Sequence, residues 1–210
     1  MKALCIQSEF KFQYLNEIDF LAAYRIQQRL VEEKINNPCY PDFILGLSHH
    51  PCFTVGRMGE ISDIKSWDFP VYFTDRGGKV TYHGPGQLVI YMIMNIKPLG
   101  VKGYLDFLEK NIVRLLTRLG VPDNAIATNL RGRGIWVNGK KVCSLGIGIR
   151  KWISYHGVSI NLDKRVHEGF KVIVPCGLQS EEISSLQEVY RAFSPRFVFY
   201  KFKELFNVGS

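Results

Sequence analysis

The chain has 210 residues, of which 46% are hydrophobic and 22% are charged. This composition can bury enough apolar surface to offset the entropy lost on folding, which excludes intrinsically disordered and fibrous proteins. The length predicts one domain that spans residues 1–210. No apolar run is longer than residues 88–94, and the first residues lack a signal-peptide pattern, so we expect a cytoplasmic protein that does not interact with a membrane.

Basic residues outnumber acidic ones, 27 to 19, which gives a formal net charge of +8 and favours an acidic partner. The basic residues are spread along the chain, and no RNA-binding motif or block of five like charges is present. We therefore expect no nucleic-acid partner.

The five cysteines form no C-x-x-C pair and match no zinc-ligand spacing, so reduced thiols and no metal are predicted.

The first half of the chain predicts strands around one helix. A helical stripe of apolar residues predicts a helix over residues 17–34, with Asn16 as its cap. Short runs rich in strand-forming residues predict strands at residues 3–7, 43–47, 71–73 and 88–96.

The second half predicts two more helices and a hairpin. Leucines at three- and four-residue intervals predict a helix over residues 105–119, and Asn138–Gly139 is typical of a hairpin turn within residues 134–149. A strand is expected at residues 158–161, and Ser194 followed by Pro195 predicts the start of a last helix. Together these elements indicate an α+β fold with a mixed, largely antiparallel sheet and packed helices.

The most unusual segment is residues 76–87, which read R-G-G-K-V-T-Y-H-G-P-G-Q directly before an apolar strand. Its four glycines permit close approach of the backbone to a ligand, and its polar side chains offer hydrogen-bond donors. A long surface loop is the alternative interpretation. The segment is neither a P-loop nor a dinucleotide-binding turn.

Two cysteines are candidate nucleophiles. Lys141 and Cys143 lie two residues apart in a predicted strand, and a neighbouring ammonium would lower the pKa of a thiol, so spacing alone favours Cys143. Cys176 follows the apolar run 172–175 and precedes Gly177, which predicts a more accessible thiol at a strand end. Each cysteine could instead be a buried structural residue.

Four histidines are candidate bases, although separated histidines are as often structural: His50, His83, His156 and His167.

Residues 48–56, 75–87, 134–146, 150–161 and 175–177 together resemble the lipoyl(octanoyl) transferases. The resemblance covers nearly the whole chain, and the run at residues 76–87 is its most specific motif. One departure is His49, where such enzymes often have glutamate. The fold that this implies is the catalytic domain of the biotin and lipoate protein ligases.

The resemblance implies transfer of an octanoyl or lipoyl group from acyl carrier protein to a lysine of a lipoyl domain. It implies that Cys176, and not Cys143, carries the acyl thioester and that Lys141 tunes this thiol. The substrate-binding residues that it implies are Arg76, Gly77, Gly78, Lys79, Val80, Thr81, Tyr82, His83, Ser144, Leu145, Gly146, Gly157, Val158 and Ser159.

The acceptors implied are the lipoyl domains of 2-oxoacid dehydrogenase complexes and the glycine cleavage H protein. No cofactor or metal is expected, because the thioester arrives activated, and we expect a monomer. An ATP-using lipoate ligase of similar fold and a catalytically silent acyl- or nucleic-acid-binding module remain as alternatives.

Overall fold

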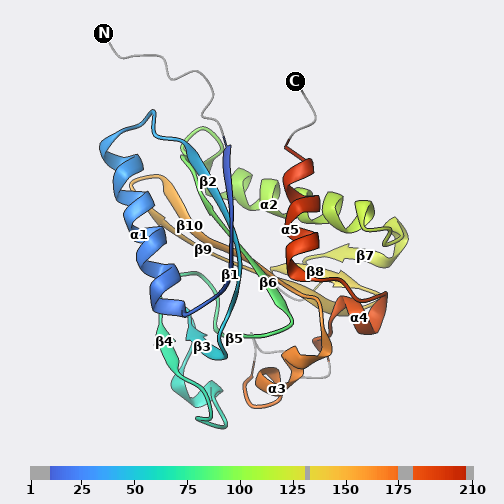
Figure 1. Ribbon diagram of the computed structural model, residues 1–210. Helices are drawn as coiled ribbons and strands as arrows, with labels where there is room; N and C mark the ends of the chain where they lie inside the picture. The colour runs from blue at the N-terminus through green and yellow to red at the C-terminus, as the bar shows by residue number, and fades with distance from the viewer. Residues whose placement is uncertain (1–9, 131–132, 175–181, 207–210) are drawn as a thin grey trace.

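A seven-stranded mixed sheet forms the centre of the protein (Figure 1), in a computed structural model that describes residues 10–130, 133–174 and 182–206. In spatial order its strands are β1 (Phe10–Ile18), β2 (Asp42–His49), β6 (Gln87–Ile93), β10 (Ile153–Asn161), β9 (Lys140–Arg150), β8 (Gly134–Val137) and β7 (Ile126–Thr128). The outer pair β1 and β2 is parallel, and every other pair in this sheet is antiparallel.

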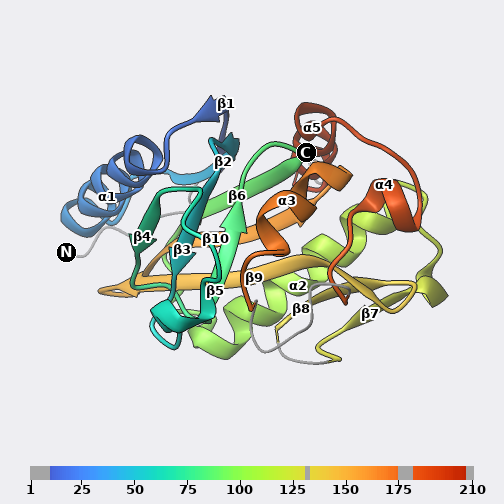
Figure 2. The same ribbon diagram turned by 90° about the horizontal axis from the view of Figure 1, so that it is seen from below.

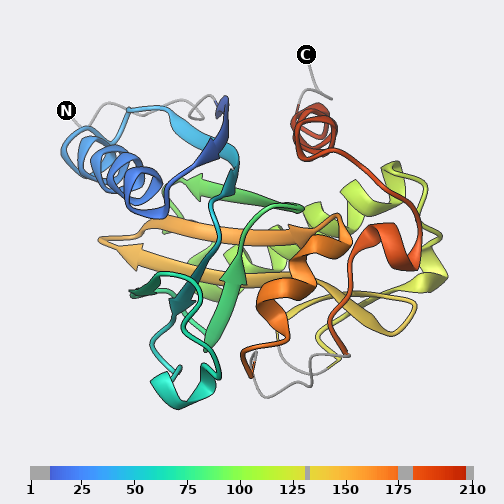
Figure 3. The same ribbon diagram turned by 60° about the horizontal axis from the view of Figure 1, so that its bottom comes forward.

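A second sheet of three short strands lies at the lower end of the large sheet in Figure 1 and toward the viewer in Figures 2 and 3. Its order is β4 (Val71–Phe73), β3 (Cys52–Val55) and β5 (Val80–His83), with the short helix α3 (His167–Phe170) packed against it. Phe53, Tyr82 and Phe170 are the large side chains of its apolar core. Single-turn 3-10 helices lie at Ile61–Asp63, Asp123–Ala125 and Lys164–Val166.

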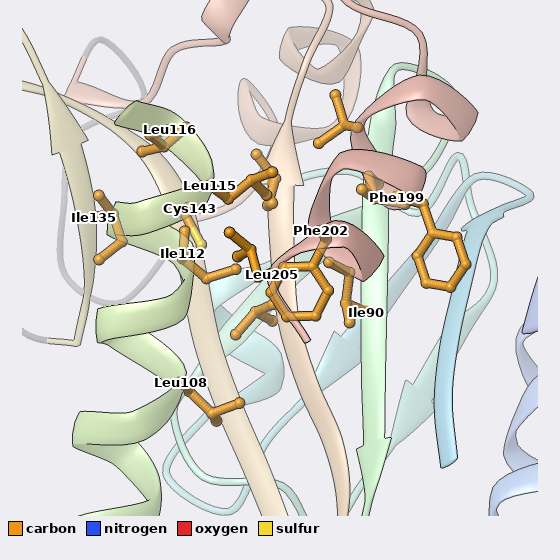
Figure 4. Packing of buried hydrophobic residues seen from close by; sticks show 14 of the residues in the cluster. Ile90, Leu108, Ile112, Leu115, Leu116, Ile135, Cys143, Phe199, Phe202 and Leu205 are labelled. Carbon is orange, nitrogen blue, oxygen red and sulfur yellow. The ribbon is translucent and has the colours of Figure 1, made fainter. Parts of the chain in front are cut away.

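Helices cover both faces of the large sheet. Helix α1 (Phe20–Asn36) lies on one face, and α2 (Gly100–Arg118) and α5 (Pro195–Glu204) lie on the other (Figure 1). The short helix α4 (Leu186–Val189) precedes α5. The layer under α2 and α5 is the larger apolar core, and Figure 4 shows Cys143 within it, beside Ile112 and Leu115 of α2.

The α+β fold and the mixed, largely antiparallel sheet are confirmed. Several element boundaries differ, because side-chain contacts override local propensity at the ends. Helix α1 begins at Phe20, and the carboxylate of Asp19 caps it by accepting from the Ala22 amide at 3.1 Å. Asn16 lies inside β1 at a φ of 57°, where the register with β2 shifts. The predicted strand 3–7 lies outside the described residues.

The glycine-rich run contains an element that its composition concealed. Residues 80–83 form β5, and only the residues around them are loop. All four glycines of the run were also expected to permit close approach of the backbone to a ligand. Gly84 and Gly86 instead pack closely: an added Cβ would lie 2.0 Å from the Tyr82 hydroxyl and 3.0 Å from Asp163, respectively.

Among the described residues, no helix combines the length and the hydrophobicity needed to span a bilayer. Cys52 and Cys143 are free thiols, whereas Cys39 is disulfide-bonded. The expectation that all five thiols are reduced is therefore corrected at Cys39.

Candidate active site

An irregularity in strand β9 decides which way Lys141 and Cys143 face. Trp136 pairs with Lys141 and Ile135 pairs with Cys143, so two steps along β9 oppose one step along β8. This β-bulge leaves Val142 as the extra residue, and Val142 and Cys143 both enter the core under α2. Lys141 faces the opposite side. The expected period of two, which put Lys141 and Cys143 on one face, is wrong for that reason.

Lys141 is nearly buried, with 4% of its surface exposed, and it lines a cavity. Its ammonium lies 5.4 Å from the centre of the Trp136 ring, a cation–π distance. Its carbonyl accepts from the Ser184 amide at 2.9 Å, and the backbone beside it bridges to Ile183. Contacts on both sides of the strand therefore hold Lys141 in place.

The cavity beside Lys141 has a volume of about 650 Å³ including its open mouth. Strands β3, β5, β6, β9 and β10 contribute its walls, and Phe20 comes from α1. Apolar side chains at Phe20, Val89 and Val158 alternate with buried polar groups around it. A concave site of this kind suits a short apolar chain with a polar head.

The residues of the predicted site that line this cavity come from three segments. They are Arg76, Gly78, Thr81, His83, Lys141, Ser144, Leu145, Gly146, Gly157, Val158 and Ser159. Gly77 and Lys79 line an adjoining cavity. Cys176 lies outside the described residues.

Val80 and Tyr82 do not line either of these cavities. Successive side chains of a strand point to opposite faces, so Thr81 and His83 face the cavity while Val80 and Tyr82 enter the core of the small sheet. The continuous set of substrate-binding residues expected from Arg76 to His83 is therefore interrupted at these two positions.

Arg76 shapes the glycine-rich loop. Its guanidinium donates to the carbonyls of Thr54 (2.6 Å), Gly77 (2.9 Å) and Lys79 (2.8 Å), and also to the Thr54 hydroxyl. Gly78, held between these contacts, has a φ of +87°, a conformation that glycine adopts without strain. Arg76 therefore fixes the loop that forms one wall of the cavity.

Gly157, which has no side chain, lies in another part of the cavity wall. A Cβ at this position would lie 2.3 Å from the carbonyl oxygen of Ile90 on the neighbouring strand, so any side chain would force β6 and β10 apart. The close pairing of these strands brings Val158 and Ser159 to the cavity.

The two free cysteines of the described chain are poor nucleophiles. Burial raises the pKa of Cys143 to about 12, despite the nearby Lys141 ammonium. Burial likewise raises the pKa of Cys52 to about 12. Since the thiolate is the reactive form, neither residue suits covalent catalysis.

The hydrogen bonds of His83 determine which of its nitrogens carries the proton. The Asn161 amide nitrogen donates to the Ser184 carbonyl (3.1 Å), so its oxygen accepts from Gln87 (2.9 Å). Gln87 also donates to the Tyr82 carbonyl (3.3 Å), which leaves its oxygen to accept from His83 Nδ1 (2.6 Å). Burial lowers the pKa of His83 well below its usual value. His83 is therefore neutral, with the lone pair on Nε2.

Two further buried histidines lie near His83: His156 lines the cavity, and the His49 ring lies 5.6 Å from the His83 ring. His49 donates from Nδ1 to the Ile18 carbonyl (3.1 Å) and accepts at Nε2 from the Tyr91 hydroxyl (2.7 Å), and burial lowers its pKa to about 4. His156 donates to Asp75 (3.1 Å), and burial lowers its pKa as well. The hydrogen bond from His156 is the main cause of the pKa of about 2 at Asp75. His49, where such enzymes often have glutamate, therefore makes structural hydrogen bonds beside the site.

Sequence reasoning missed several residues that line the cavity: Phe20, Thr54, Val89, Tyr91, Arg133 and Ile183. It also missed that His156 lines the cavity. His156 was marked only as a candidate base, and its φ of 57° has no signal in the sequence. Within the described ranges, no group of three or more His, Cys, Asp or Glu side chains is arranged to hold a metal ion.

Comparison with known proteins identifies the family. Residues 19–206 match the family described as the lipoyl protein ligase A/B catalytic domain. An octanoyltransferase of Bdellovibrio bacteriovorus is 36% identical over 202 residues, covering 85% of this chain and 88% of that protein. The chain belongs to the octanoyltransferase family. It is therefore an enzyme of the acyltransferase class.

Other comparisons agree with this membership. An octanoyltransferase of Nostoc punctiforme is 38% identical over 175 residues, covering 80% of this chain and 74% of that protein. The octanoyltransferase fold described above resembles lipoate-protein ligase A bound with ATP, with a TM-score of 0.69 at 12% identity over 96% of this chain and 86% of that one. The expected likeness to the lipoate ligase catalytic domain is thereby confirmed at the level of fold.

Proposed function

We propose that this enzyme transfers an octanoyl group from acyl carrier protein to a lysine of a lipoyl domain, through a thioester on Cys176. The observation that carries the proposal is the position of Lys141, buried at an apolar cavity and turned away from Cys143. Membership of the octanoyltransferase family supports octanoyl transfer in lipoylation.

The first step moves the acyl group to the enzyme. The Cys176 thiolate attacks the carbonyl carbon of the carrier thioester, the carbon–sulfur bond to the carrier breaks, and the carrier leaves as a thiol after taking a proton. The Lys141 ammonium would stabilise the attacking thiolate and could supply that proton.

The second step forms the amide. The neutral amine of the acceptor lysine attacks the Cys176 thioester, the bond to sulfur breaks, and the amine loses a proton. Lys141, neutral after the first step, can accept it. The Nε2 lone pair of His83 on the cavity wall can accept a hydrogen bond within the same site.

The decisive experiment mixes the enzyme with octanoyl carrier protein and a lipoyl domain, without ATP, and follows acyl-enzyme and amide by intact mass. We expect one octanoyl adduct on wild-type enzyme. Cys176→Ala should lose both the adduct and the transfer, whereas Cys143→Ala should keep both.

Full transfer by Cys176→Ala would overturn the thioester assignment. Absence of transfer unless ATP and free octanoate are supplied would show a ligase instead.

A further inference from the structure

A second cavity adjoins the first one at Lys141. It measures about 1080 Å³ including its open mouth, and the two cavities share Gly78, Arg133, Lys141, Leu145 and Gly146. We propose that this second cavity binds the phosphopantetheine arm of the acyl carrier protein during the first transfer. This inference rests on the proposed function.

The shared wall of the two adjoining cavities fits the shape of a thioester. The reacting carbonyl has an acyl chain on one side and a thiol arm on the other. If it lies beside Lys141, the acyl chain can occupy the first cavity while the arm extends into the second. A single closed pocket would have no room for both substituents.

The walls of the second cavity fit the middle of such an arm. Helix α2 contributes Val101 and Leu105, and β9 contributes Ile147 and Ile149. Met58 is 67% exposed on the rim. The short methylene segments of the arm can pack on these side chains, while its amide groups reach the solvent at the open mouth.

The charges of the second cavity fit the phosphate at the end of the arm. Arg57 and Lys79 both line it, and neither side chain forms an ion pair with any residue of the described ranges. Arg133 is already paired with Glu109 at 2.7 Å. Two cations without acidic partners in the described part of the chain favour a phosphate monoester.

The same charges disfavour the other substrate, the lipoyl domain with its acceptor lysine. A lysine ammonium that entered the second cavity would meet Arg57, Lys79 and Lys141, and like charges repel at short range. The cavity therefore discriminates between the two substrates: it favours the anionic donor arm and disfavours the cationic acceptor.

The test compares two small donors, octanoyl-pantetheine 4′-phosphate and octanoyl-pantetheine, which differ only in the phosphate. With a lipoyl domain as acceptor, wild-type enzyme should show a kcat/KM about tenfold higher for the phosphorylated donor. In Arg57→Ala/Lys79→Ala this ratio should fall to about one. Lys110→Ala, which removes an exposed cation of α2 outside the cavity, should keep the wild-type ratio.

A second measurement uses pantetheine 4′-phosphate as an inhibitor of transfer from octanoyl carrier protein. Its inhibition constant should rise about tenfold in the double variant. Should the double variant fail to fold by circular dichroism, the exposed Arg57→Ala alone should lower the donor ratio about threefold.

An unchanged ratio in folded Arg57→Ala/Lys79→Ala, or an equal loss in Lys110→Ala, would overturn the arm site. Either result can occur while octanoyl carrier protein remains a donor, so the proposed function would survive it. Failure of wild-type enzyme to use octanoyl carrier protein would instead reject the proposed function.

Discussion

Strand β9 has two buried faces with opposite chemistry. The face toward α2 places Cys143 among aliphatic side chains, where burial raises its pKa to about 12 (Figure 4). The opposite face places Lys141 at a cavity whose wall includes His83 and Ser159. Cys143 and Lys141 are both almost inaccessible to solvent, with exposures of 1% and 4%.

The difference shows that burial by itself does not identify a reactive group. Cys143 is surrounded by carbon, which disfavours its charged form. Lys141 lies above the Trp136 ring and beside polar groups of the cavity wall. These groups lower the free-energy cost of burying its ammonium. A bulge of one residue, at Val142, separates the two environments.

The largest effect is expected from Lys141→Met, which removes the ammonium and keeps the side-chain volume. Octanoyl transfer should fall by about 10²–10⁴-fold, the range for loss of a group that moves protons. The free energy of unfolding is measured alongside, so that a loss of transfer is scored only in folded protein. Steady-state transfer and urea unfolding measure the two quantities.

Leu115→Ala is the matched control on the other face. It leaves a hole in the core under α2 and should lower the free energy of unfolding by about 3 kcal/mol while kcat/KM per folded molecule is retained. The comparison between the two faces fails if Lys141→Met transfers normally or if Leu115→Ala loses transfer while folded.

A second prediction concerns thiol labelling. Cys52 and Cys143 should react with iodoacetamide at about pH 8 roughly a thousandfold more slowly in the native protein than in urea, because a pKa of about 12 leaves almost no thiolate. Peptide mass mapping over time gives the rates. Fast labelling of Cys143 in the native protein would show that its thiol is accessible and would make it a candidate nucleophile again.

The smallest effect is expected from pH. The unfolded chain protonates His49 near its ordinary pKa of about 6.5, whereas the folded protein does so only near pH 4. The unfolded state therefore binds more protons between these values, and stability must fall as the pH drops through this window. From about pH 7 to about pH 5, His49 should lower the free energy of unfolding by about 2 kcal/mol.

His83 and His156 act in the same direction, because burial lowers their pKa values too. Asp75 stays charged in this range, since its pKa is about 2. Urea unfolding at both pH values tests the effect, and His49→Gln should reduce the difference. Equal stability of wild-type protein at the two pH values would mean that these imidazoles are charged in the folded state.

Local patterns in the sequence were sufficient for much of the fold. The leucine spacing that predicted a helix over residues 105–119 matches α2, the turn at Asn138–Gly139 joins β8 to β9, and Ser194 caps α5 by accepting from the Phe197 amide. The candidate segments at residues 76–83, 141–146 and 157–159 all contribute to the cavity wall, whereas the segment at 175–177 lies outside the described residues. The helix spacing, the turn and the cap depend on nearest neighbours along the chain.

The orientation of the site residues was decided by tertiary structure. The bulge in β9 arises from pairing with β8, the tautomer of His83 follows from a network that reaches Ser184, and Arg76 contacts Thr54 from another strand. Each depends on groups far apart in the sequence that meet only when the sheets form. The sequence by itself therefore determined the fold class and indicated segments that line the cavity, whereas the tertiary structure decided which side chains reach it, because a shift of one residue in strand pairing reverses the face of a side chain.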